Sequence, residues 1–268
     1  MRGEKKLNKE RLPVIISIPH GGSVVPKEAR ESFQLEEQEV LRDGDTWTRD
    51  IFDYKKKVLA LVDTEIPRVV IDLNREKEDL PPKNFDGVVK SKSVFLNPVW
   101  KNPRGPEENL RRTLIEKYYD PYYQKVLKAL ENPEIKLGID CHSMLPEDPF
   151  DKRAKKRPLF CISNRGGLKG EWVKAPLSAP PEMLLAFKEL LEGEFGKESV
   201  QINNPFTGGY ITRYFGMKKG VPWIQLEVNR SLYLPPKGPI TSTPRGEHRE
   251  RVDMLSHGIF NGIKGLKL

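Results

Sequence analysis

The sequence predicts an α/β fold, with a mixed and mostly parallel central sheet flanked by helices. Short apolar runs rich in β-branched residues have the composition of buried strands, and longer segments of helical periodicity alternate with them. No internal repeat or linker interrupts this alternation over the 268 residues. We therefore expect residues 1–268 to form a single domain.

Each expected strand is a short apolar run bounded by turn-forming residues. The first, VIISI, lies between Pro13 and Pro19, and the second, RVVIDL, is also largely apolar. Their apolar character indicates that these strands are buried. The expected strands cover residues 14–18, 68–73, 136–141, 158–163, 199–202 and 222–228.

Helical periodicity fills most of the intervening segments. Residues 35–61 have it at both ends, with a break at the acidic DGD of Asp43 to Asp45. Pro121 is expected to interrupt the helical pattern around it, because proline lacks the N–H group that a helix interior needs. Residues 81–106 are rich in proline and asparagine and predict a long irregular excursion, a kind of segment that often carries function. Further helices are expected at residues 106–130, 181–195 and 245–263.

The charge of the chain favours anionic ligands. Lys and Arg number 46 against 38 Asp and Glu, which gives a net charge of +8. Nucleic acid or a small carboxylate would suit such a surface, but the basic clusters at residues 55–57 and 152–157 lack the interleaved aromatic residues of a single-strand binding surface. We therefore interpret these clusters as solvated faces and expect no nucleic-acid partner.

Other features of the composition favour a cytoplasmic protein. No run approaches the roughly 20 apolar residues of a membrane span, and the charged N-terminus lacks the apolar segment of a signal peptide. Cys141 and Cys161 lie in apolar runs, which favours buried, reduced thiols over a disulfide. We expect no membrane partner, and the sequence does not predict the oligomeric state.

Polar side chains suited to catalysis follow the expected strands. His20 comes directly after the first strand, and Asn74 and Arg75 come after the second. His142 follows GIDC, and Glu227 lies near the end of WIQLEV. In open α/β sheets, ligand sites form outside the carboxyl ends of the strands. We therefore expect these side chains to converge on one site.

Two histidines on separate strands, together with a carboxylate, suit a catalytic zinc site. Such a site has three protein ligands and keeps one position for water. His20 and His142 supply the imidazoles, and the DGD loop offers the carboxylate, for which we select Asp45, with Asp43 as an alternative or an outer partner. Helix capping by either aspartate is a competing interpretation. We expect one divalent ion, Zn²⁺.

Hydrolysis at such a site also needs a general base and an anchor for the substrate. A bound metal ion lowers the pKa of its water to roughly 7, and a side chain must still take the proton. Glu227 is the candidate base, because a carboxylate inside an apolar strand is costly unless it has a function or a partner. Arg75 or Arg213 is expected to hold a substrate carboxylate through a forked pair of hydrogen bonds.

Other catalytic motifs are absent or poorly placed. The chain has no H-E-x-x-H pair, no G-x-S-x-G elbow and no P-loop. Ser143 beside His142 does not favour a hydrolase triad, since adjacent residues on a strand point in different directions. GGY at residues 208–210 predicts a tight turn near the pocket rather than a dinucleotide site.

Six blocks occur in a characteristic order along the chain: IPHGG, DGDTW, VIDLNR, GIDCHSM, GGYITRYFG and QLEVNRSLY. In this order they resemble the N-formylglutamate amidohydrolase family, whose members have the fold of zinc carboxypeptidases. The resemblance covers roughly Ile15 to Tyr233. It implies that His20 and His142 are zinc ligands and that an acidic residue of the DGD loop completes the set.

The resemblance also implies roles for residues outside the metal site. Glu227 is similar to the carboxylate that activates water in carboxypeptidase-like sites. Asn74 and Arg75 match a pair that holds the substrate carboxylate in related enzymes. Arg213 and Arg230 are implied as further anion contacts.

Two departures from the related patterns bear on the site. His20 is followed by GGS rather than by the H-x-x-E of the carboxypeptidases, which moves the carboxylate ligand to Asp45. Residues 148–158 are strongly basic and are expected to shape the rim of the pocket.

We therefore expect a metal-dependent hydrolase that cleaves the amide of a small-molecule N-formyl or other N-acyl amino acid, with Glu227 as general base. A carboxypeptidase or cell-wall peptide amidase with the same metal site is the alternative among enzymes. A basic anion-binding or nucleic-acid-binding protein with an inactive site is the alternative from another class, and it predicts binding that weakens steeply with salt.

Overall fold

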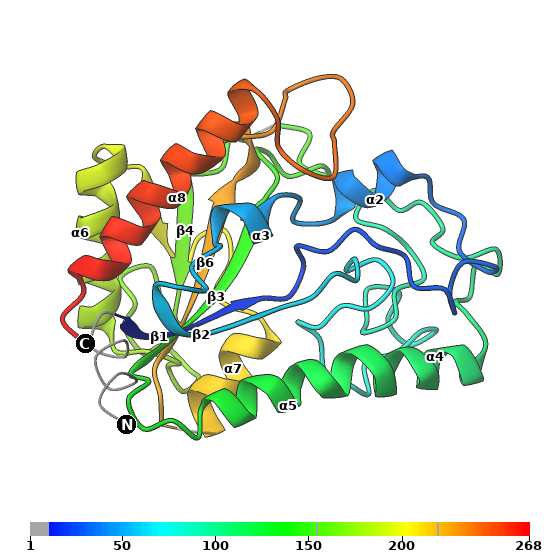
Figure 1. Ribbon diagram of the computed structural model, residues 1–268, viewed down its shortest axis with the longest axis horizontal. Coiled ribbons are helices and arrows are strands. Elements are labelled where there is room, and N and C mark those ends of the chain that lie inside the picture. Colours follow the sequence, from blue (N-terminus) through cyan, green and yellow to red (C-terminus); the bar gives the residue numbers. More distant parts are fainter. Residues whose placement is uncertain (1–10, 154, 219) are drawn as a thin grey trace.

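Six strands form one sheet, and the computed structural model describes residues 11–153, 155–218 and 220–268 around it (Figure 1). The strands are β1 (Leu12–Ile18), β2 (Val58–Asp63), β3 (Leu137–Met144), β4 (Phe160–Ser163), β5 (Val200–Ile202) and β6 (Trp223–Asn229). Their order across the sheet is β2-β1-β3-β6-β4-β5. β4 pairs antiparallel with β6, whereas the other four neighbouring pairs are parallel. The expected mixed, mostly parallel sheet is confirmed.

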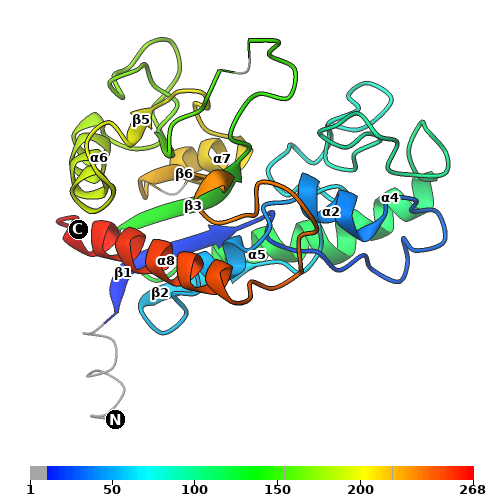
Figure 2. The same cartoon turned by 90° about the horizontal axis from the view of Figure 1, so that it is seen from above.

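Helices cover both faces of this sheet (Figures 1 and 2). They are α2 (Glu37–Asp43), α3 (Thr48–Ile51), α4 (Glu108–Leu114), α5 (Asp120–Ala129), α6 (Pro181–Phe195), α7 (Tyr210–Lys218) and α8 (Glu247–Gly265), with a π-helix, η1 (Ile115–Tyr119), and a 3₁₀-helix, η2 (Arg230–Leu232). α6 and α8 pack against each other and bury an apolar cluster that includes Ile139 and Leu226. α5 and α7 bury a second cluster, which includes Ile211 and Trp223, on the opposite face.

The register of β3 and β6 gathers polar residues on one face of the sheet. His142 lies opposite Glu227, and Asp140 lies opposite Gln225. Because side chains alternate along a strand, all four point to the face that α5 and α7 cover. Their apolar neighbours point toward α6 and α8.

Residues 68–73 do not form the strand predicted for them. Residues 68–70 form a turn, in which the Val70 amide donates to the Pro67 carbonyl at 2.9 Å. The run is buried because it packs with apolar residues of the 81–106 excursion, and the Asp72 amide donates to the Val88 carbonyl at 2.7 Å. β2 forms one edge of the sheet instead, at residues where the end of a helix was predicted. The predictions of a strand at residues 68–73 and of a helix up to residue 61 are therefore wrong.

The helical segment at residues 106–130 is confirmed, with an interruption. α4 widens into η1, and α5 begins at Asp120, so that Pro121 lies in the first turn of α5, where a missing N–H group costs little. The helix at residues 181–195 is confirmed as α6, and that at residues 245–263 as α8 with a shift of two residues. α7 was not predicted, because GGY at residues 208–210 was expected to be a turn only.

Both cysteines are buried and form no disulfide, as predicted. Cys141 belongs to the apolar cluster under α6 and α8, whereas Cys161 lies on β4 opposite Glu227. None of the helices that the structure describes is both long and apolar enough to cross a membrane.

Candidate metal centre

The three predicted metal ligands lie together at the carboxyl ends of β1 and β3. His20 follows β1, His142 lies in β3 and Asp45 follows α2, and all three side chains are buried. The two imidazole ring centroids are 4.8 Å apart. Oδ2 of Asp45 lies 3.4 Å from Nδ1 of His20 and 3.1 Å from Nδ1 of His142. One donor atom from each residue therefore lies close enough to the other two for all three to share a cation.

A carboxylate holds the outer nitrogen of each histidine. Nε2 of His20 lies 2.7 Å from Oδ1 of Asp72, and Nε2 of His142 lies 2.9 Å from Oδ2 of Asp140. An ionised carboxylate only accepts hydrogen bonds, so each Nε2 donates to its outer carboxylate, and each Nδ1 faces Asp45. Metal-binding histidines have such an outer carboxylate in many sites, where it fixes the ring and its tautomer.

The donor atoms suit a divalent transition metal ion. Nδ1 of His20 is buried and has no hydrogen-bond partner among the described residues. A buried nitrogen without a partner costs free energy, and a cation bound to its lone pair would remove that cost. Two imidazole nitrogens and one carboxylate oxygen are the ligand types of a catalytic Zn²⁺ site. The residues present therefore fit the expected ion.

Arg230 and Ser143 hold Asp45 in its orientation. Oδ1 of Asp45 accepts from Nη2 of Arg230 at 3.0 Å and from Oγ of Ser143 at 3.3 Å, so Oδ2 faces the histidines. Burial alone would raise the pKa of Asp45, but the adjacent imidazoles of His142 and His20 outweigh burial and hold the pKa well below its usual value. Asp45 is therefore an anion at neutral pH, as a metal ligand must be.

Asp43 turns away from the histidines. Its Oδ2 accepts a hydrogen bond from the Val94 amide at 2.6 Å, which ties the end of α2 to the excursion at residues 81–106. The geometry thus favours Asp45 over Asp43 as the carboxylate ligand.

A buried charge cluster surrounds Asp72, and the sequence alone did not predict it. Oδ2 of Asp72 lies 3.0 Å from Nζ of Lys90 and 3.2 Å from Nη2 of Arg68, while its Oδ1 holds His20. Burial would raise the pKa of Asp72, but attraction to His20, Lys90 and other cations keeps the pKa well below its usual value. Lys90 is itself almost fully buried and also pairs with Asp86. The outer partner of His20 is therefore anchored from several sides.

Glu227 lies on β6 beside His142 and is buried. Burial raises the pKa of Glu227 to about 7, against the attraction of His142. Its Oε1 accepts a hydrogen bond from Nε2 of Gln225 at 2.9 Å, and Oε1 of Gln225 accepts the Gly209 amide at 2.7 Å. A buried carboxyl group with a pKa near neutrality is suited to accept and return protons.

Strand alternation is a signal that would have identified two of the missed residues. Asp140 lies two positions before His142, and Gln225 lies two positions before Glu227, so each shares a face with its partner. Asp72 lies 52 residues from His20, in a loop that resembled a strand, and no local pattern connects the two.

Asn74 lies beside His142, and Arg75 is the next residue after Asn74 in the sequence. Nδ2 of Asn74 is 3.3 Å from Nε2 of His142, and its Oδ1 accepts the Ile211 amide in the first turn of α7. Arg75 donates from Nε to the Asp86 carbonyl at 2.8 Å, from Nη2 to the Asp86 carboxylate and from Nη1 to the Asn74 carbonyl. These bonds use three of the five N–H groups of the guanidinium, so two remain for a ligand.

The other two predicted anion-binding arginines differ in exposure. The Arg213 side chain, on α7, is 42% exposed and lies 5.0 Å from the centroid of the Tyr210 ring and 3.6 Å from Oε2 of Glu76. Arg230 is buried and donates to Ser143, Asp45 and the carbonyls of residues 42 and 43, so four of its five N–H groups are used. The structure thus places Arg213 at the surface of α7 and Arg230 against Asp45.

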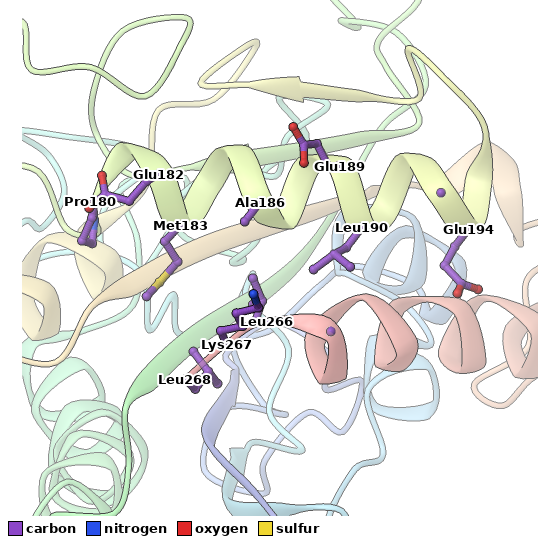
Figure 3. A pocket seen from close by; sticks show the side chains of 12 residues that line it. Pro180, Glu182, Met183, Ala186, Glu189, Leu190, Glu194, Leu266, Lys267 and Leu268 are labelled. Carbon is purple, nitrogen blue, oxygen red and sulfur yellow. The ribbon is translucent and has the colours of Figure 1, made fainter.

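Two pockets differ in their relation to this centre. One of about 790 Å³ lies between α6 and the C-terminal end of α8, where Met183 and Leu190 point toward Leu266 (Figure 3). None of the residues that line it belongs to the metal centre. Another, of about 530 Å³, has Arg230 in its wall, and Arg230 in turn contacts Asp45.

Comparison with known proteins gives a consistent result. The family model described as N-formylglutamate amidohydrolase matches residues 12–234. N-formylglutamate deformylase from Pseudomonas putida is 29% identical over 244 residues, covering 86% of this chain and 85% of that protein. A protein of the same name from Pseudomonas aeruginosa is 25% identical over 239 residues, with 85% of each chain covered. The crystal structure of N-formylglutamate amidohydrolase from Ralstonia eutropha superposes with a TM-score of 0.74 at 18% identity, covering 95% of this chain and 94% of that one.

Proposed function

The chain belongs to the N-formylglutamate amidohydrolase family, and from this premise we propose that it hydrolyses the amide bond of an N-formyl or other small N-acyl amino acid, N-formylglutamate above all. We propose that residues 1–268 act as one catalytic domain and that a single divalent ion, Zn²⁺, is held by His20, Asp45 and His142. The relatives named above support the reaction, and the donor geometry supports the metal.

One observation carries the metal assignment. Nδ1 of His20 and Nδ1 of His142 both face Oδ2 of Asp45, while Asp72 and Asp140 hold the two Nε2 atoms. Two imidazoles whose rings are fixed by outer carboxylates, beside an anionic Asp45, form the kind of ligand set that a divalent transition metal ion binds.

Glu227 is proposed as the general base and, later, the general acid. When bound, the ion would lower the pKa of a water molecule and polarise the scissile carbonyl. Glu227 takes the proton of the attacking water on its carboxylate and then gives it to the nitrogen of the leaving amine. Its buried position beside His142, and a pKa near 7, suit both transfers at neutral pH.

The substrate is proposed to be held through its carboxylate groups, with Asn74 and Arg75 on the α-carboxylate and Arg213 as a further anion contact. Arg75 is fixed by Asp86 and keeps two N–H groups for a forked contact with a carboxylate. Arg230 keeps one N–H group for such a contact, and its main proposed contribution is to aim Asp45.

Metal analysis combined with substrate assays tests this function. Purified protein should contain about one equivalent of metal and should hydrolyse N-formyl-L-glutamate faster than peptides with a free C-terminus or cell-wall peptides. His142→Ala should lose both metal and activity. Retention of full activity in that variant, or faster turnover of peptides, would refute the proposal. Salt-sensitive binding of nucleic acid with no hydrolysis would instead favour the binding-protein alternative.

A further inference from the structure

The backbone of Arg165 has a conformation that residues other than glycine seldom adopt. Its φ is 71°, in the left-handed region, and its amide donates to the Thr207 carbonyl at 2.7 Å. This conformation costs free energy, and such residues are concentrated at sites where a side chain must be directed at a ligand. The strain at Arg165 therefore calls for a functional explanation.

The side chain of Arg165 is half-buried, and one nitrogen of its guanidinium is buried without a partner in the described part of the chain. Its Nε is buried and makes no hydrogen bond with any residue that the structure describes. Nearly all buried polar atoms in proteins are paired, so an unpaired guanidinium nitrogen indicates a missing acceptor. An anion would supply it.

Arg213 places a second positive charge next to Arg165. Burial lowers the pKa of Arg165, and repulsion from Arg213 lowers it further. The ion pair of Arg213 with Glu76, at 3.6 Å, is exposed and leaves Arg165 unneutralised. Two neighbouring like charges repel each other, and a carboxylate that binds to both would relieve this repulsion.

The loop at residues 207–209 connects this arginine pair to the proposed catalytic residues. A Cβ at Gly208 would lie 3.2 Å from Cγ of Arg165, so that side chain packs against the loop. A Cβ at Gly209 would lie 2.2 Å from Nδ2 of Asn74, the side chain beside His142. The Gly209 carbonyl accepts the amide of Arg213 at 3.1 Å. Arg165 and Arg213 thus both contact the loop at residues 207–209, and this loop packs against Asn74, the proposed substrate-binding residue.

We propose that Arg165 and Arg213 bind the side-chain carboxylate of an acidic N-acyl amino acid and give the enzyme its preference for dicarboxylate substrates. This inference rests on the proposed function. The α-carboxylate of the substrate remains with Asn74 and Arg75, whose two available N–H groups are separate from the arginine pair. Arg165 is then a specificity-determining residue, and it takes no part in the proton transfers.

A pair of substrates that differ only in charge tests this assignment. N-formyl-L-glutamate and N-formyl-L-glutamine have nearly the same shape, and only the first has a side-chain carboxylate. Arg165→Gln should raise KM for N-formyl-L-glutamate about 10- to 100-fold, the range expected for losing a hydrogen bond to a charged group. The same variant should change kcat/KM for N-formyl-L-glutamine less than about threefold.

Two further variants separate a direct contact from effects on folding or on net charge. Arg165→Gly should fold at least as well as the parent, because glycine adopts a φ of 71° without strain, and should lose the same preference. Arg112→Gln removes one positive charge from an exposed arginine on α4 and should leave the preference unchanged. Equal losses for both substrates in Arg165→Gly, or an unchanged ratio, would overturn the inference.

Product binding tests the inference without any turnover. Calorimetric titration should show that the parent binds L-glutamate more tightly than L-glutamine, and that Arg165→Gly loses this difference. That result together with no hydrolysis of any N-formyl amino acid would refute the proposed function and leave the arginine pair supported. Hydrolysis of N-formyl amino acids by a parent protein that shows no preference for glutamate would support the proposed function and refute the role of the arginine pair.

Discussion

Gln225 donates a hydrogen bond from Nε2 to Oε1 of Glu227 across 2.9 Å, and the direction of this bond is fixed by the backbone. The Gly209 amide donates to Oε1 of Gln225 at 2.7 Å, so the NH₂ group of Gln225 must face the carboxylate. One face of β6 thereby connects the loop before α7 to the proposed base. Glu227 is held in one place by a residue that never needs to touch the substrate.

Replacing Gln225 should slow turnover without weakening substrate binding. Gln225→Met keeps the volume but removes the donor to Glu227, and we expect kcat to fall about tenfold, equivalent to ~1.4 kcal/mol of activation free energy. KM and metal content should stay near their parental values. Gln201→Met, on the exposed side of β5, is the matched control. A rise in KM at unchanged kcat would show that Gln225 acts on the substrate instead.

Glu227→Gln should retain the fold and the metal while losing most of its activity. General-base catalysis contributes roughly 10²- to 10⁴-fold, so kcat should fall by that factor. Metal content, measured by elemental analysis, should match that of the parent, because Glu227 is not one of the three ligands. Glu189→Gln, at an exposed position on α6, should behave like the parent. Normal turnover in Glu227→Gln would exclude this residue as the base.

Arg75→Lys should chiefly weaken substrate binding. Lysine cannot reproduce the fork that Arg75 forms with Asp86, nor the two N–H groups that remain beside it, so KM for N-formyl-L-glutamate should rise about tenfold. Steady-state kinetics should show kcat within about threefold of the parent. Arg112→Lys, on the surface of α4, provides the control for the same exchange. A loss in kcat with KM unchanged would contradict a binding role.

The sequence predicts best those features that depend on local pattern. α6 has the predicted bounds because Pro181 begins an apolar periodicity that ends before Gly196. His20 and His142 were predicted as ligands because strand ends in an α/β sheet lie at one edge, which requires no knowledge of pairing. The structure brings both to Asp45, as expected.

Features that depend on distant partners were not predictable in this way. Residues 68–73 have the composition of a buried strand, but their burial comes from a loop that packs on them, and composition does not distinguish these cases. Asp72 acquires its role only when that loop passes His20. Arg165 is one basic residue among many in the sequence, and only its backbone angle and unpaired Nε distinguish it.

Removing the metal should lower the melting temperature, and the effect should depend on His142. A ligand that binds only the folded state stabilises it by ~2.7 kcal/mol at 100 times its Kd, which corresponds to about 5–10 °C for a chain of this size. Chelation should therefore lower Tm by about that amount, and added Zn²⁺ should restore it. His142→Ala should melt at one temperature with and without Zn²⁺, because the remaining pair of ligands holds a cation far less tightly. His257→Ala, which removes an exposed histidine on α8, should keep the full shift. The same Zn²⁺-dependent shift in both variants would show that the stabilising ion binds elsewhere, and it would refute the metal site proposed at His20, Asp45 and His142.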